Sequence, residues 1–159
     1  MAHEMAHEIA HARWLEEVDM ALSISFVVTL DDTDLGAFYT CEGLGCEVVV
    51  ESREEGGNNG FVHQFPTRLK YPNIKFTRPL GRDTVKVTRL FSSMVSGYRR
   101  STATIVVRRG DNTPLVRWSL TGVLPIRWTG PSLNPDQSKV LTETLEIAHQ
   151  GFEPLPTSL

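Results

Sequence analysis

Ser52-Arg53-Glu54-Glu55-Gly56-Gly57-Asn58-Asn59-Gly60-Phe61 separates two segments that are typical of β-strands. Fixing the backbone of one residue costs about 1–2 kcal/mol, and glycine lies at the upper end of that range. Residues 54–60 contain no apolar side chain whose burial would offset this cost. We therefore predict a loop that projects from a packed body and becomes ordered against a partner.

The segments outside this loop have the alternating pattern of β-strands. Residues 22–30 alternate apolar and polar side chains, as expected of a strand with one buried face. The same reasoning predicts strands at residues 44–51, 61–65, 73–78, 102–108, 115–128 and 139–149. Residues 31–36 and 110–114 have the composition of turns. Pro66 and Pro72 are predicted to bound the segment between them, because proline lacks an amide donor.

One helix is predicted, with Asp83 as its N-cap and Gly97 at its end. Its apolar positions, spaced at i, i+3, i+4, i+7 and i+8, are Val87, Leu90, Phe91, Met94 and Val95. About seven strands with one helix and short connections predict a mainly β (α+β) fold, an antiparallel β-barrel or sandwich with one packed α-helix.

The chain has 159 residues, which fits one domain. Residues 1–19 repeat histidine and alanine and are predicted to form an N-terminal arm, while residues 20–159 form the β-barrel domain. The net charge of −3 predicts no general attraction to nucleic acid. The sequence has no apolar run of ~20 residues and no basic start followed by an apolar stretch, so we expect cytoplasmic synthesis without a signal peptide or membrane insertion.

Two overlapping copies of the zinc-peptidase pattern His-Glu-x-x-His begin at His3 and His7. A tandem repeat at the chain terminus generates this pattern by its period, so we predict no catalysis and at most adventitious metal binding by His3, His7 and His11. The glycine-rich loop lacks a following Gly-Lys-Ser/Thr, so no nucleotide or other cofactor is expected. Cys41 and Cys46 are interpreted as reduced, structural residues.

Charged residues are unevenly distributed along the middle of the chain. A basic group comprises Arg68, Lys70, Lys75, Arg78, Arg82, Lys86 and Arg89, and an acidic group before it comprises Glu42, Glu47, Glu51, Glu54 and Glu55. Two interpretations remain open for them, a solvated surface and complementary contacts between subunits.

The loop described first, together with Arg127-Trp128-Thr129-Gly130-Pro131 and Glu143-Thr144-Leu145-Glu146-Ile147-Ala148-His149-Gln150-Gly151, resembles the tail tube proteins of contractile phages and extracellular contractile injection systems. The resemblance covers residues 22–152. Further matching positions between the loop and these motifs are Pro66, Lys70, Tyr71, Pro72 and Asn73. It implies a structural subunit that forms hexameric rings stacked into a hollow conduit for cargo or DNA. The implied partners are further copies of the chain and sheath, baseplate and tube-terminating proteins.

The predicted subunit interface combines the loop with two shorter segments. It comprises Arg53, Glu54, Glu55, Gly56, Gly57, Asn58, Asn59, Gly60, Tyr71, Pro72, Asn73, Trp128, Gly130 and Pro131. For Trp128, packing in the core of its own chain is the alternative. Two other functions remain open: a monomeric β-barrel that binds a small ligand, and a specialised tube-initiator or terminal ring subunit, which the long N-terminal arm favours.

Overall fold

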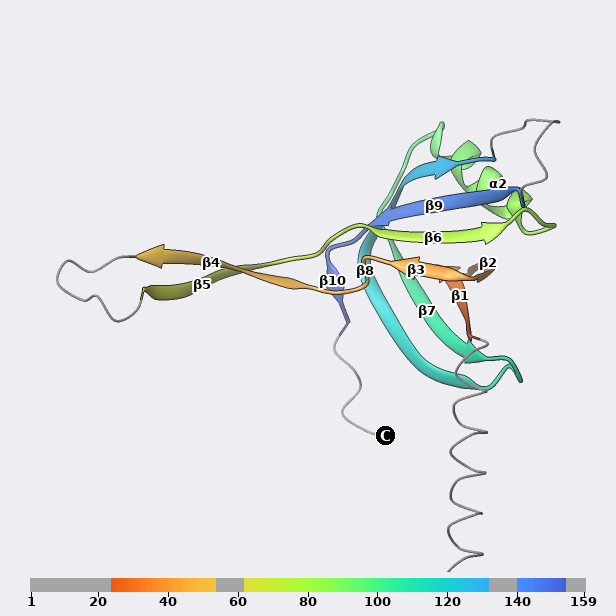
Figure 1. The fold of residues 1–159 in the computed structure, drawn as a ribbon. Helices are drawn as coiled ribbons and strands as arrows, with labels where there is room; N and C mark the ends of the chain where they lie inside the picture. Colours follow the sequence, from red (N-terminus) through yellow and green to blue (C-terminus); the bar gives the residue numbers. More distant parts are fainter. Residues whose placement is uncertain (1–23, 54–61, 132–139, 154–159) are drawn as a thin grey trace, which may run out of the picture.

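The computed structural model describes residues 24–53, 62–131 and 140–153 (Figure 1). The predicted arm and residues 54–60 of the loop lie outside this part of the chain. The elements are β1 (Ile24–Leu30), β2 (Thr33–Phe38), β3 (Thr40–Glu42), β4 (Glu47–Arg53), β5 (His63–Lys70), β6 (Ile74–Pro79), α2 (Thr84–Met94), β7 (Ser101–Arg109), β8 (Pro114–Thr129), β9 (Thr142–Ala148) and β10 (Gly151–Phe152).

The body of the protein is an eight-stranded sheet in the order β2-β1-β7-β8-β9-β6-β3, with β10 added to β8. Every ladder is antiparallel. For the part of the chain that the structure describes, the predicted mainly β fold with one helix is therefore confirmed. The predicted barrel is wrong in one respect, because the sheet has ends at β2 and β3 and is not closed.

The two ends of the sheet are consecutive in the chain. Tyr39 alone separates β2 from β3, so one extended segment pairs first with β1 and then with β6. The Tyr39 N–H donates to the carbonyl of Thr77 at 3.0 Å and continues the second ladder to this point. The chain itself thus crosses from one margin of the sheet to the other.

The core lies on the inner faces of these strands, as the alternating pattern predicts. Its buried apolar side chains are Val28, Leu30, Leu35, Phe38, Ile74, Phe76, Val87, Ala103, Ile105, Leu120, Val123, Leu145 and Ile147. Burying one such Val, Leu, Ile or Phe side chain fully stabilises the fold by about 1.5–3 kcal/mol relative to leaving it exposed. The period-two residues of the body therefore supply its main source of stability.

Helix α2 packs through fewer apolar residues than predicted. Val87 is buried, Leu90 and Phe91 pack partly against the core, and Val95 is 91% exposed beyond the helix end. Asp83 precedes the helix as expected, but it makes no side-chain capping bond and pairs with Lys86 instead. Gly97 ends the helical region at a φ of +131°.

Two proposed boundaries are wrong for identifiable reasons. The turn predicted at residues 31–36 is confined to Asp31 and Asp32, and the apolar Leu35 is buried within β2. Pro66 does not bound a strand but lies inside β5. Its missing N–H is tolerated there because β5 belongs to a two-stranded sheet and the register shifts beside its partner Val50.

Candidate subunit interface

The β4–β5 ribbon, residues 47–53 paired with residues 63–70, is the most prominent feature outside the body. It forms a separate two-stranded sheet that projects away from the body (Figure 1). The register runs from Glu47 opposite Lys70 to Arg53 opposite His63. Seven residues of β4 extend over about 23 Å at ~3.3 Å per residue. The loop that is predicted to meet a partner therefore begins well away from the core.

The ribbon has two chemically different faces, because side chains alternate along each strand. Val48 lies opposite Leu69 and Val50 lies opposite Pro66, which gives one apolar face. Val48 is 50% exposed and Leu69 is 53% exposed. The apolar face of the ribbon, defined as Val48, Val50, Pro66 and Leu69, is therefore left accessible by the single chain.

The opposite face of the ribbon is mostly charged. Its cross-strand pairs are Glu47–Lys70, Val49–Arg68, Glu51–Phe65 and Arg53–His63. An isolated two-stranded hairpin is only marginally stable in water. A ribbon with one solvated face and one apolar face therefore gains stability when another surface covers the apolar face.

Aromatic side chains hold the root of the ribbon to the body. Tyr71 directly follows β5, and its ring lies 5.3 Å from that of His149 and 5.9 Å from that of Phe152, between centroids. Gly151 makes this approach possible, because a Cβ there would lie 3.3 Å from the Tyr71 ring and φ is +147°. Tyr71, predicted at the interface, thus also packs within its own chain.

Five more predicted interface residues lie in or next to β8 and β6, the two strands that flank β9. Asn73 donates to Glu146 Oε1 at 3.0 Å beside the root of the ribbon, and Pro72 next to it is exposed. Trp128 is half-buried near the start of β9, where its Nε1 donates to Glu143 Oε2 at 2.8 Å. Gly130 and Pro131 follow it and are half-buried. Both segments therefore adjoin β9, and their use as an interface stays a prediction.

Arg78 is part of the basic group, but its side chain is buried. It therefore belongs neither to a solvated surface nor to a contact between subunits. Its Nε donates to Glu143 Oε1 at 2.6 Å, and its NH1 group donates to the Leu35 carbonyl at 2.6 Å. Its guanidinium lies 4.3 Å from the centroid of the Phe38 ring. The signal that identifies its burial is its register, since it follows buried Ile74 and Phe76 at intervals of two on β6.

Sequence reasoning also missed two polar rows on the outer face of β3, β6, β9 and β8. One row of laterally paired residues is Thr40, Thr77, Thr144 and Thr129, and the next is Glu42, Lys75, Glu146 and Arg127. The second row alternates in sign, and Arg127 Nε lies 4.0 Å from Glu146 Oε2. Neighbouring opposite charges stabilise such a face in water, so this face does not need to be covered by a partner.

Cys41 is the residue with the most strongly shifted acidity. Burial, and to a smaller extent the nearby Glu42, raises the pKa of the Cys41 thiol to about 11. Both Cys41 and Cys46 are free thiols, and Cys46 is exposed. A thiol that stays protonated at neutral pH is a poor nucleophile and metal ligand, which agrees with a structural role for Cys41.

Residues 24–53, 62–131 and 140–153 contain no cluster of three or more His, Cys, Asp or Glu side chains that could hold a metal ion. The histidines considered for adventitious binding, His3, His7 and His11, lie outside those residues. Within the same residues, no helix combines the length and the apolar character needed to cross a bilayer.

Chains in solved structures of contractile injection particles have a similar overall fold. A chain in the anti-feeding prophage baseplate is 21% identical, with a TM-score of 0.66 over 86% of this chain and 95% of that chain. A chain in the sheath-tube complex of the PVC extracellular contractile injection system is 16% identical, with a TM-score of 0.67 over 80% and 86%. A chain in the PVC sheath/tube terminator is also 16% identical, with a TM-score of 0.66 over 80% and 91%.

A family match over most of the chain defines the class as tail tube proteins, structural subunits of an inner tube. The family model of the T4-like virus tail tube protein gp19 matches residues 22–153. The chain belongs to this family. A comparison with curated proteins found no match.

Proposed function

We propose that this tube subunit assembles into hexameric rings that stack into a hollow conduit for cargo or DNA. The observation that carries the proposal is the apolar face of the ribbon, which the single chain exposes on a segment that extends away from its core. Membership of the tail tube family supports it. The similar chain in the anti-feeding prophage baseplate, a six-fold symmetrised structure, supports the ring.

Two kinds of contact are sufficient for such an assembly. A heterologous contact within a ring closes after a fixed number of copies, while an axial contact repeats without limit. We assign the ribbon, the loop at residues 54–60 and the N-terminal arm to contacts of the axial kind. The segments Tyr71–Asn73 and Trp128–Pro131 are candidates for the remaining predicted contacts.

The particles in which similar chains occur support a proposal for the partners. Solved relatives lie in a sheath-tube complex, a baseplate and a tube-terminating cap. We infer that this chain also meets sheath, baseplate and terminating proteins, after synthesis and assembly in the cytoplasm. A role as a terminal ring is the second candidate, favoured by the similarity to the PVC sheath/tube terminator and the anti-feeding prophage cap.

Negative-stain electron microscopy and size-exclusion chromatography of the purified chain test the proposal. A tube subunit forms six-fold rings or filaments, whereas a terminal subunit forms rings that do not stack. A species that stays at 17.8 kDa at high concentration would contradict both roles and favour a monomeric ligand-binding protein.

A further inference from the structure

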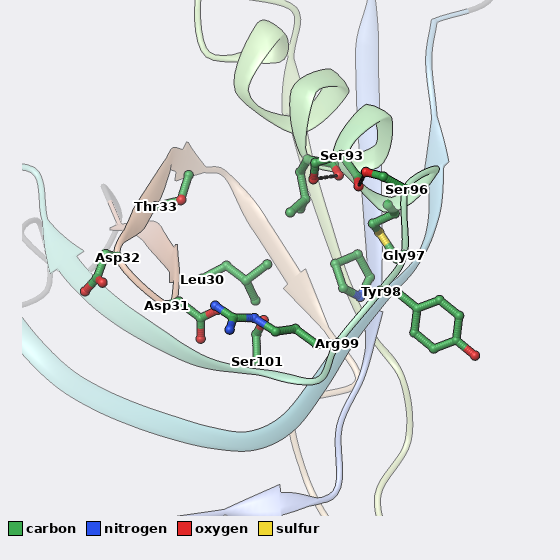
Figure 2. A pocket seen from close by; sticks show the side chains of 13 residues that line it. Leu30, Asp31, Asp32, Thr33, Ser93, Ser96, Gly97, Tyr98, Arg99 and Ser101 are labelled. Atoms are coloured by element: carbon green, nitrogen blue, oxygen red, sulfur yellow. Dashed lines mark hydrogen bonds between the residues drawn. The ribbon is translucent and has the colours of Figure 1, made fainter.

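A cleft of about 630 Å³ opens between the β1–β2 turn, the end of α2 and the start of β7 (Figure 2). Its lining includes the apolar side chains of Leu30, Leu90, Met94 and Pro125. Polar side chains from the turn and from the start of β7 complete the lining. The cleft therefore combines an apolar part with a polar and charged rim.

The rim of the cleft carries charges of both signs. Asp31 and Asp32 supply carboxylates, and Arg99 supplies a guanidinium that lies beside Asp31 in Figure 2. A second hollow contains the same three residues together with Arg100, whose NH1 group donates to the Gly122 carbonyl at 2.9 Å. These two acidic and two basic side chains complement a protein segment that carries charges of both signs. They complement a ligand of one charge sign less well.

Local hydrogen bonds fix the acidic side of the rim. Asp31 has a φ of +48°, its N–H donates to the Thr102 carbonyl, and its Oδ1 accepts the Thr102 N–H, both at 2.8 Å. These bonds tie the β1–β2 turn to β7. Asp32, the next residue, is exposed and free to meet a partner without disrupting this link.

The far end of the ribbon has matching chemistry. Glu51 and Arg53 lie on its charged face, and their carboxylate and guanidinium are 3.4 Å apart with side chains 57% and 70% exposed. Phe65 lies opposite Glu51 on the same face and is 50% exposed. The far end therefore offers both signs of charge beside the apolar side chain of Phe65.

The ribbon and the cleft also lie on different sides of the molecule. In Figure 1 the ribbon extends to one side of the body, while α2, whose end lines the cleft, lies at the other side. A projection on one side and its receptor on the other produce a heterologous contact that repeats from copy to copy.

We propose that the cleft receives the far end of the β4–β5 ribbon of a second copy, with Arg53 facing Asp32 and Glu51 facing Arg99. The apolar side chain of Phe65, on the same face, then packs against Leu90 and Met94. The inference rests on the proposed stacking of subunits and assigns the receiving surface for the ribbon.

Charge reversal and its rescue test this contact. Arg53→Glu and Asp32→Arg each place like charges together, and each raises the protein concentration required for assembly about tenfold, equivalent to about 1.4 kcal/mol per contact. The double variant, Arg53→Glu with Asp32→Arg, again places opposite charges together, with their positions exchanged. It returns the concentration required for assembly close to the wild-type value. As a matched control, Glu153→Arg reverses another exposed carboxylate and does not rescue Arg53→Glu.

A covalent test uses Asp32→Cys with Arg53→Cys in a chain that also carries Cys41→Ser and Cys46→Ser. Oxidation of the assembled protein yields disulfide-linked multimers on a non-reducing gel. The cleft proposal is wrong if the single charge-reversal variants form normal rings and tubes, the double variant shows no rescue and the cysteine variant forms no cross-links. The proposed function stays intact in that case. A wild-type chain that does not assemble overturns both.

Discussion

Arg78 and Glu143 form an ion pair whose Nε and Oε1 atoms are 2.6 Å apart, with side chains 4% and 1% exposed. Glu143 also accepts hydrogen bonds from Thr84 Oγ1 and Trp128 Nε1, so this carboxylate joins β6, β9, β8 and the first turn of α2. A paired charge is tolerated in the interior, whereas a single charge left without its partner is strongly unfavourable.

We predict that Glu143→Gln lowers the free energy of unfolding by about 3–5 kcal/mol, because it leaves the Arg78 charge buried without its counter-ion. Urea unfolding followed by circular dichroism measures the loss. Glu51→Gln is the matched control, since its pair with Arg53 is exposed and its change should stay within about 0.5 kcal/mol. Equal effects of the two substitutions would contradict the assigned role of the buried pair.

The combined change Val48→Thr and Leu69→Thr is expected to abolish stacking while the subunit stays folded. Threonine suits a β-strand, but its hydroxyl reduces the gain from covering the apolar face of the ribbon. Electron microscopy reports the stacking and circular dichroism reports the fold. Val85→Thr, at an exposed position on α2, is the control and leaves stacking in place. Normal tubes from the double variant would show that the apolar face is not used.

Replacing Gly43 by alanine should destabilise the protein by about 1–3 kcal/mol. Gly43 has a φ of +86°, and a Cβ there would collide with the Asn73 carbonyl oxygen. Gly45 lies in the same connection between β3 and β4, yet a Cβ there meets nothing within 4 Å. Gly45→Ala should therefore be neutral or slightly stabilising in thermal unfolding, and a loss equal to that of Gly43→Ala would count against this interpretation.

The Cys41 thiol makes stability depend on alkaline pH. Its pKa is about 11 in the folded chain against an ordinary value of 9.0, so the unfolded chain releases this proton first as pH rises. The contribution is fully present below pH 9 and is lost as pH rises towards 11. Unfolding curves at several pH values should show this decline in the wild type and a smaller one in Cys41→Ser. Identical declines would exclude Cys41 as the cause.

Alternation of side chains predicted the body of the fold well. Val28 and Leu30 are buried where the period of two places them, and the hairpin loop before Pro114 joins β7 to β8 as expected. The same rule failed at residues 31–36, because polar residues around Leu35 concealed a short strand. It also gave no sign that the sheet ends at β2 and β3, since the lateral order of strands is a property of long-range pairing.

The candidate site was predictable in part. The position of the ribbon follows from two strand-like segments around residues 54–60, and β4 and β5 confirm those segments. The two faces of the ribbon depend on the register between β4 and β5, and this register shifts beside Val50. Composition alone does not reveal such a shift. The cleft near Asp32 joins segments almost 70 residues apart, Asp32 and Arg99 among them, so spacing along the sequence gave no signal for it. The interface itself remains a prediction.

The single-residue step at Tyr39 between β2 and β3 has a mechanical consequence. A sheet with two independent margins can be peeled strand by strand from either one. Here the same short stretch of backbone forms both margins, so tension that detaches β3 from β6 also pulls on the junction of β2 with β1. The two margins of the subunit are therefore mechanically coupled through Tyr39.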